Sequence, residues 1–188
     1  MALTSTARKT SVFANQETTH FDDLFETYWP KVCATLYRLT GDWDDAQDLA
    51  LEVFYRLHQR PPKDSSRVSS WLYRVATRIG FNALRARQRR WQYEAQAEQV
   101  RLEQEIPLDP SVQVEQQETQ QRVRRALSEM RPRAAQLLIL RHSGLSYAEI
   151  ADALNVAPGS VGTLLARAES EFTHRFRALE TTHPGGRT

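Results

Sequence analysis

The sequence contains a single cysteine, Cys33, among 188 residues. An intrachain disulfide and a four-cysteine zinc site are therefore excluded, and a reducing, cytosolic compartment is expected. Long apolar runs are also missing, because no stretch approaches the roughly 18 consecutive apolar residues of a membrane-spanning helix. Residues 1–19 lack the apolar core of a signal peptide, so export by that route is not expected.

Glycine and proline are scarce, with seven and eight residues, and most of them stand where a helix would end. No segment alternates apolar and polar residues for long enough to indicate a strand. Apolar residues recur instead at steps of three and four, which predicts helices. The expected fold class is all-α, with two small helical domains joined by a polar linker.

Helix ends can be predicted from capping residues. The apolar face of a first helix runs from Phe21 to Leu39, and Asp42 is expected to cap a second helix that Pro61 and Pro62 end. Residues 60–70 are expected to form a loop, with Ser69 or Ser70 capping a third helix that runs to about Arg90.

Composition divides the chain into five segments. Helical domains are expected at residues 20–92 and 119–180, because both carry periodic apolar residues. Residues 93–118 are rich in Gln and Glu and are expected to be a linker, partly helical at best. Residues 1–19 and 181–188 are expected to be disordered tails.

Charge is small overall, at +2, but is segregated along the chain. Residues 71–93 hold six arginines and no acid, residues 94–118 hold seven acids and one arginine, and residues 119–145 hold six arginines and one acid. These blocks are either ordinary solvated helix faces or surfaces for differently charged partners, and their alternation favours the second interpretation.

The third helix has two distinct faces. Leu72, Val75 and Ile79 lie on an apolar stripe, whereas arginines gather on the other side with aromatic residues near them. Arginines neutralise phosphates and aromatic rings stack on unpaired bases, so this face suits melting DNA. Trp71 is expected either to pack in the core or to contact DNA, and Phe81 is expected to contact a neighbouring helix.

A helix-turn-helix is predicted near the C-terminus. Ser146 and Glu149 form a capping box that opens a short helix, Asn155 suits a left-handed turn, and Pro158 suits the first turn of the next helix. The spacing is that of a DNA-binding helix-turn-helix, and a plain helical hairpin is the alternative. The exposed start of its second helix offers Ser160 and Thr163 but no basic residue before Arg167, which predicts weak base readout.

Three segments together resemble the motifs of the sigma-70 family of RNA polymerase sigma factors. They are residues 45–54 (DAQDLALEVF), 71–76 (WLYRVA) and 144–151 (GLSYAEIA), and the short two-domain layout is similar to the extracytoplasmic-function (ECF) group. The resemblance covers residues 20–92 and 115–178. It implies a sigma factor that binds core polymerase, recognises a promoter and helps to melt its −10 region.

The resemblance also implies partners and site residues. The first domain would dock on the β′ coiled coil of core RNA polymerase, the second would sit on the β flap and read the −35 element, and the tether would thread into the RNA exit path. An anti-sigma factor is a further partner that the resemblance implies. The implied core polymerase-binding residues are Asp45, Asp48, Leu49 and Glu52. The implied −10 residues are Arg60, Lys63, Arg67, Trp71, Arg74, Arg78, Asn82, Arg85 and Arg89, and the helix-turn-helix DNA-binding residues are Ser160, Thr163 and Arg167.

Several residues depart from the family pattern. Leu51 stands where Gln is usual, Arg78 where Asn is frequent, and Asn82 where Asp is common. Gly162 and Leu164 stand where a basic residue is typical in the recognition helix. These departures put −35 specificity in doubt and leave the −10 sequence unreadable by analogy.

Two other classes of function fit the sequence less well. A free-standing, dimeric helix-turn-helix regulator would bind duplex DNA without polymerase, but it would need neither the acidic second helix nor residues 71–74. An enzyme is not expected, because the five histidines are scattered and no phosphate-binding glycine loop is present. No metal site and no cofactor are expected.

Overall fold

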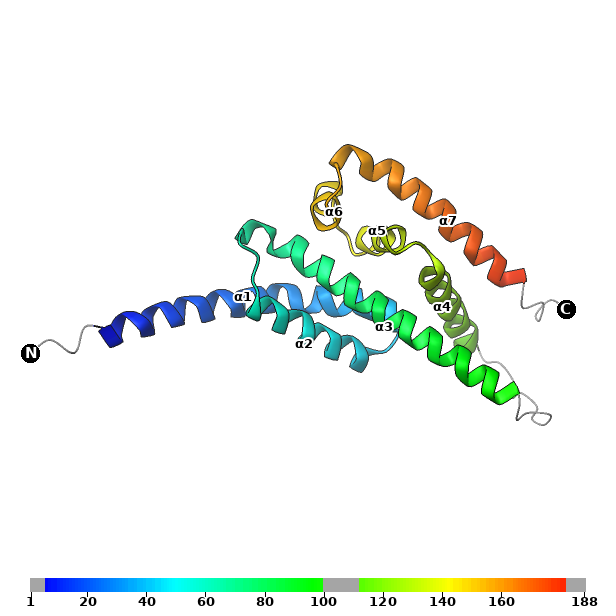
Figure 1. Ribbon diagram of the computed structural model, residues 1–188, viewed down its shortest axis with the longest axis horizontal. Helices are drawn as coiled ribbons and strands as arrows, with labels where there is room; N and C mark the ends of the chain where they lie inside the picture. The colour runs from blue at the N-terminus through cyan, green and yellow to red at the C-terminus, as the bar shows by residue number, and fades with distance from the viewer. Residues whose placement is uncertain (1–5, 100–111, 182–188) are drawn as a thin grey trace, which may run out of the picture.

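The computed structural model describes residues 6–99 and 112–181, and every regular element in those ranges is helical (Figure 1). The prediction of an all-α fold is therefore confirmed. The helices are α1 (Thr6–Thr40), α2 (Trp43–Gln59), α3 (Val68–Gln99), α4 (Val112–Glu129), α5 (Pro132–His142), α6 (Tyr147–Leu154) and α7 (Val161–Thr181), with short 3-10 helices η1 (Ser65–Arg67) and η2 (Pro158–Ser160).

The first three helices pack around one apolar core. Gly41 adopts a φ of +73°, which ends α1 in the left-handed region, and the Asp42 carboxylate then accepts a hydrogen bond of 3.0 Å from the backbone N of Asp45. The predicted cap of α2 is thus confirmed, and α2 ends before Pro61 and Pro62 as expected. The core is formed by Val32, Leu36, Val53, Phe54, Leu57, Leu72 and Ala76, among others.

The start of α3 differs from the prediction. The carboxylate of Asp64 accepts hydrogen bonds from the backbone N of Ser66 at 2.9 Å and from its hydroxyl at 2.6 Å, and this cap begins η1. Helix α3 follows at Val68, so Ser69 and Ser70 lie inside it and cap nothing. The prediction was wrong because Asp64 caps earlier, and a carboxylate is a good N-cap.

Helical structure also reaches into segments expected to be irregular. Residues 6–19 belong to α1 instead of a disordered tail, because they contain neither proline nor glycine to interrupt it. Residues 93–99 continue α3 past Arg90, and residues 112–118 begin α4, so only the middle of the predicted linker is outside these helices. Residues 100–111 and 182–188 lie outside the described residues.

The remaining helices form the second domain. The capping box of α6 is confirmed, because the Ser146 hydroxyl accepts from the backbone N of Glu149 while the Glu149 carboxylate accepts from the backbone N of Ser146. Asn155 adopts a φ of 52° and a ψ of 59°, the left-handed turn that the prediction required. Pro158 lies in η2, at the entry to α7. In Figure 1, α3 lies between α1 and α2 on one side and α4 to α6 on the other.

Candidate nucleic-acid and polymerase interfaces

The predicted −10 residues of α3 share one face of the helix. Trp71, Arg74, Arg78, Asn82, Arg85 and Arg89 follow one another at steps of three and four, so an α-helix turns them to the same side. The side chains of Arg74, Arg78, Asn82 and Arg89 are exposed. We call this set the α3 arginine face.

The segment before α3 supplies further cations. Arg60 is the residue after the end of α2, Lys63 lies in the loop, and Arg67 ends η1. All three side chains are exposed. Hydrogen bonds from Ser66, first its hydroxyl and then its backbone N, lower the pKa of the Asp64 carboxyl. That carboxylate lies 3.6 Å from the Arg67 guanidinium, which helps to keep one cation at the start of α3.

The two aromatic residues of α3 have different surroundings. Trp71 is half-buried and packs against the core of the first domain, so most of its ring surface is structural. Phe81 is 2% exposed and packs among residues of the second domain, which confirms that it contacts a neighbouring helix. The guanidinium carbon of Arg85 lies 5.7 Å from the Phe81 ring centroid, a cation–π distance.

Helix α2 presents an acidic surface. Asp45 and Asp48 are exposed and Glu52 is partly exposed, whereas Leu49 is half-buried against the domain core. Glu52 forms a 2.7 Å ion pair with Arg56, and Asp45 lies 3.9 Å from Arg87 of α3. Asp48 has no ion pair among the described residues, so its carboxylate is available to a partner.

Two apolar residues beside these acids were not predicted as part of the site. Leu51 is 54% exposed and Tyr55 is 61% exposed. They are four residues apart, and helical geometry places them next to Asp48 and Glu52. The sequence held a signal, because both fall outside the core stripe formed by Ala46, Ala50, Val53 and Leu57. With the acids they form the α2 docking face.

The recognition helix, α7, exposes the predicted side chains. Ser160 ends η2, and Thr163 and Arg167 lie in the first two turns of α7, all exposed. A Cβ at Gly162 would lie 3.6 Å from Tyr147 Cε2, an ordinary van der Waals contact, and a Cβ at Gly159 would meet nothing within 4 Å. The side chains at the start of α7 are therefore small, and a DNA backbone could approach this end of the helix closely.

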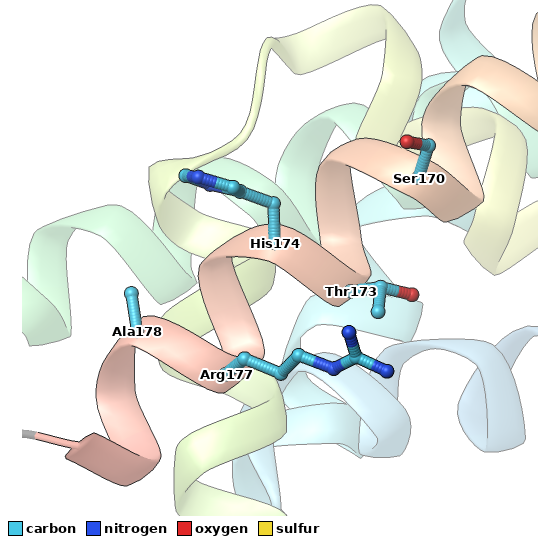
Figure 2. Close-up of a pocket in the computed structure, with 5 residues that line it drawn as sticks. All are labelled: Ser170, Thr173, His174, Arg177 and Ala178. Carbon is cyan, nitrogen blue, oxygen red and sulfur yellow. The ribbon is translucent and has the colours of Figure 1, made fainter.

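A surface hollow and the possible metal ligands were compared with the predicted site residues within the described part of the chain. A hollow of about 520 Å³ lies farther along α7, and Figure 2 shows that its lining residues Ser170, Thr173, His174, Arg177 and Ala178 all come from that helix. None of the predicted site residues lines it. Over the described part of the chain, no group of three or more His, Cys, Asp or Glu side chains could hold a metal ion.

Family models match both domains. Residues 24–90 match the model described as Sigma-70 region 2, and residues 120–171 match the model described as Sigma-70, region 4. The chain therefore belongs to the sigma-70 family of RNA polymerase sigma factors, in its ECF group. The first model covers α2 and most of α3, and the second covers the helix-turn-helix.

Individual relatives extend these matches. The chain is 27% identical over 171 residues to the ECF RNA polymerase sigma factor SigW of Bacillus subtilis, covering 85% of this chain and 90% of the relative. It is 31% identical over 173 residues to the ECF RNA polymerase sigma factor SigG of Mycobacterium tuberculosis. This match covers 78% of this chain and 46% of SigG. A co-crystal structure of the sigma factor RpoE in complex with the anti-sigma factor NepR from Bartonella quintana matches with a TM-score of 0.47 and 17% sequence identity. The match covers 84% of this chain and 97% of the chain in that structure. No helix in the described residues has the length and hydropathy to cross a bilayer.

Proposed function

We propose that this protein is an ECF sigma factor that binds core RNA polymerase, recognises promoter DNA and helps to melt the −10 region. The observation that carries the proposal is the separation of chemistries on the first domain. The α2 docking face is acidic and apolar, whereas the α3 arginine face is cationic. A subunit that joins a protein partner to DNA needs two such surfaces.

The α2 docking face is our candidate for the β′ coiled coil of core polymerase. Asp48 and Glu52 supply charge, and Leu51 and Tyr55 supply exposed apolar surface beside it. Exposed apolar side chains next to charged ones are typical of protein interfaces, where the apolar part is buried on binding. Leu49 packs inward, and we assign it the role of positioning this face.

The α3 arginine face is our candidate for the −10 element. Its exposed guanidinium groups would neutralise phosphates, and the part of Trp71 that the core leaves uncovered would contact an unpaired base. The second domain would sit on the β flap and place Ser160, Thr163 and Arg167 at the −35 element. We assign the protein no catalytic step, a cytoplasmic location with its polymerase, and an anti-sigma factor as a further partner.

Run-off transcription with purified core polymerase tests the proposal. Core alone should give no specific product on a randomised promoter library, and core with this protein should give defined start sites. A free-standing regulator would instead bind the duplex without core and leave transcription by core unchanged. That result would overturn the proposal.

Charge reversal on the α2 docking face tests its assignment. Asp48→Lys should weaken co-purification with core at least ten-fold, because it puts a cation where the partner would meet a carboxylate. The helical circular dichroism of the free protein should not change, since Asp48 is exposed and pairs with no cation in the described structure. Asp23→Lys on α1 is the matched control, because Asp23 is also exposed and should leave co-purification intact. Equal recovery of both variants with core would contradict the assignment.

A further inference from the structure

Polar contacts at the start of α5 hold the two helices of the helix-turn-helix. Helices α6 and α7 share an apolar core with α5, in which Ile150 of α6 and Val161 of α7 are fully buried. Apolar contact is not directional, so it holds the helices together without fixing how one is turned against the other. Hydrogen bonds are directional, and the first turn of α5 makes them with both α6 and α7.

Arg133, in the first turn of α5, binds the end of α6. Its Nη2 donates hydrogen bonds to the backbone oxygen of Leu154 and, at 3.1 Å, to that of Asn155. Leu154 is the last residue of α6 and Asn155 is its C-cap. Carbonyl groups at the C-terminus of a helix lack partners within the helix, and here one guanidinium supplies them. The turn between α6 and α7 is therefore held against α5.

Glu171 of α7 binds the same end of α5. Its carboxylate accepts a hydrogen bond of 3.0 Å from the backbone N of Arg131 and another of 3.1 Å from the Nε of that residue. Arg175, one turn farther along α7, adds an ion pair of 3.4 Å. The Glu171 side chain is only 13% exposed. The hydrogen bond from the Arg131 backbone, followed by the side chains of Arg131 and Arg175, lowers the pKa of the Glu171 carboxyl.

The Glu171 carboxylate also serves the N-terminus of α5. Arg131 is the N-cap residue of α5, and its own side chain makes no capping hydrogen bond. The dipole of a helix favours a negative charge at the N-terminus, and Glu171 supplies that charge from α7. One turn of α5 thus binds the end of α6 through Arg133 and the middle of α7 through Glu171.

Direct contact with DNA does not account for Glu171. A carboxylate repels phosphate groups, so an acid on a DNA-binding helix weakens binding through its charge. The side chains expected to read the −35 element, Ser160 and Thr163, are small and make few strong base contacts. Short side chains reach base edges only when the helix itself lies at the right angle in the groove. The angle of α7 therefore matters more here than it would with long basic side chains.

We propose that Glu171 and Arg133 are positioning residues for promoter recognition, which fix the angle of α7 against α6 and so set the spacing between the −35 and −10 elements that the protein accepts. The inference rests on the proposed function. One turn of duplex holds about 10–10.5 base pairs, so each base pair turns the groove by about 35°. An α7 held at one angle accepts one spacing, whereas a loosened α7 accepts neighbouring spacings as well.

Promoter spacing tests the assignment. The affinity of the holoenzyme is measured on a promoter selected from the randomised library and on versions with one base pair added or removed between the elements. Glu171→Ala should lower affinity for the best spacing about five-fold, the scale of one hydrogen bond, and change the other two by less than about two-fold. The loss at the best spacing is opposite in sign to the effect of charge, because removal of an acid alone would strengthen binding.

Arg133→Ala tests the other half of the contact. It should flatten the spacing preference in the same way, because it releases the turn between α6 and α7. If Arg133 instead contacted a phosphate, its loss would lower the affinity for all three spacings by the same factor. An equal loss of that kind, or an unchanged preference, would overturn the role of Arg133.

Glu169→Ala is the matched control for Glu171→Ala. Glu169 lies on the same helix, is exposed and forms no ion pair in the described structure, so its loss should leave the spacing preference intact. Amide hydrogen exchange in α5 and α6 should be as slow in Glu171→Ala as in the parent, which checks that the domain stays folded. If that protection is lost, Glu171→Gln keeps one acceptor oxygen and should flatten the preference without unfolding.

A distance measurement on the free protein separates this inference from the proposed function. Spin labels at Ala148→Cys of α6 and Thr173→Cys of α7, two exposed positions, report the angle between the helices in a Cys33→Ala background. The parent should give one narrow distance distribution, and Glu171→Ala should broaden it. An unchanged distribution would overturn the role of Glu171. A parent holoenzyme without defined start sites would count against the proposed function, whereas the distances would still show whether Glu171 fixes α7.

Discussion

The two helices that carry the predicted DNA contacts, α3 and α7, differ in chemistry. The face of α3 is rich in long guanidinium side chains, whereas the end of η2 and the start of α7 carry Ser160, Gly162 and Thr163 and no basic residue before Arg167. Guanidinium groups give strong, salt-dependent attraction to phosphates, and small hydroxyl residues give close approach with few bidentate base contacts. We infer that α3 provides most of the promoter affinity and α7 mostly positions the second domain.

The largest expected effect comes from removing the cations of α3. Arg74→Ala, Arg78→Ala and Arg85→Ala together should lower the promoter affinity of the holoenzyme about a hundred-fold or more, with at least about 1 kcal/mol lost for each contact. The slope of log affinity against log salt should become shallower by about two to three. Titration of labelled promoter over a salt series measures both quantities.

The contrast between α3 and α7 would be wrong if the arginines of α3 face only solvent and do not contact DNA. In that case the triple variant would open promoters as well as the parent at every salt concentration. Arg177→Ala removes one exposed cation from α7 and serves as a control for the loss of a positive charge away from the α3 arginine face. It should leave affinity and salt slope within two-fold of the parent.

The difference in base readout between α3 and α7 should become smaller when an arginine is introduced near the start of α7. Gly162→Arg should be accommodated, because a Cβ there meets only Tyr147 at 3.6 Å. A bidentate contact to guanine contributes about 1–3 kcal/mol of discrimination, so a guanine preference of about ten-fold should appear in the −35 region. Promoter selection from a library randomised in that region measures it. Gly162→Ala is the matched control, and a guanine preference in that variant would exclude the guanidinium as its cause.

The helix-turn-helix domain is also stabilised by the capping box at the start of α6, whereas α2 and η1 of the first domain begin with an aspartate cap. Ser146→Ala removes the hydroxyl that caps α6 and should destabilise the protein by about 1 kcal/mol. Hydrogen bonds from the Ser146 hydroxyl and backbone lower the pKa of the Glu149 carboxyl. This stabilisation is complete above the ordinary value of 4.5 and is lost as the pH falls through the lowered folded-state value.

Thermal melts at several pH values test this coupling. The difference between the parent and Ser146→Ala should be largest at neutral pH and should shrink as the pH falls below the ordinary carboxyl value of 4.5 and through the lowered folded-state pKa of Glu149. Ser170→Ala on the exposed side of α7 is the matched control and should show no pH-dependent difference. A constant difference across the range would mean that the carboxylate adds nothing to the cap.

The smallest expected effect concerns the hydroxyl of Thr163. Thr163→Ala should change promoter preference by no more than about three-fold, because one hydroxyl makes single or water-mediated contacts only. Selection from the same −35 library measures the preference. A sharply defined −35 motif that disappears in this variant would show that α7 reads bases directly, and the contrast with α3 would then be wrong.

Local signals were predictable from the sequence, and contacts between distant segments were not. Asp42, Ser146 and Asn155 act on backbone groups within a few residues, so their caps and turn followed from residue type alone. Ser69 and Ser70 misled because a better cap, Asp64, precedes them. Residues 60–70 contain five serine or aspartate residues that could cap a helix, so residue type alone leaves the first residue of α3 uncertain by several positions.

The arrangement of the candidate site residues was predictable in part for the same reason. The spacing of Arg74, Arg78 and Arg85 is enough by itself to place them on one face of a helix. Tyr73, Phe81 and Leu84 gave no such signal, because the residues that cover them come from helices that begin more than 25 residues later. The exposure of Leu51 and Tyr55 was not predicted because the acids beside them carry the clearer charge signal, although both residues depart from the periodicity of the core.

Because α3 is one unbroken helix, its length fixes the angle around the helix axis between the α3 arginine face and the point where the chain leaves the helix. Its 32 residues carry the α3 arginine face in the first two thirds and lead toward the second domain at Gln99, over about 48 Å at 1.5 Å per residue. Each residue inserted after Arg89 would advance the exit of the chain by about 100° around the helix axis, and four would bring it back to within about 40°. The direction in which the chain leaves α3 at Gln99 is therefore tied, turn by turn, to the direction in which the α3 arginine face points.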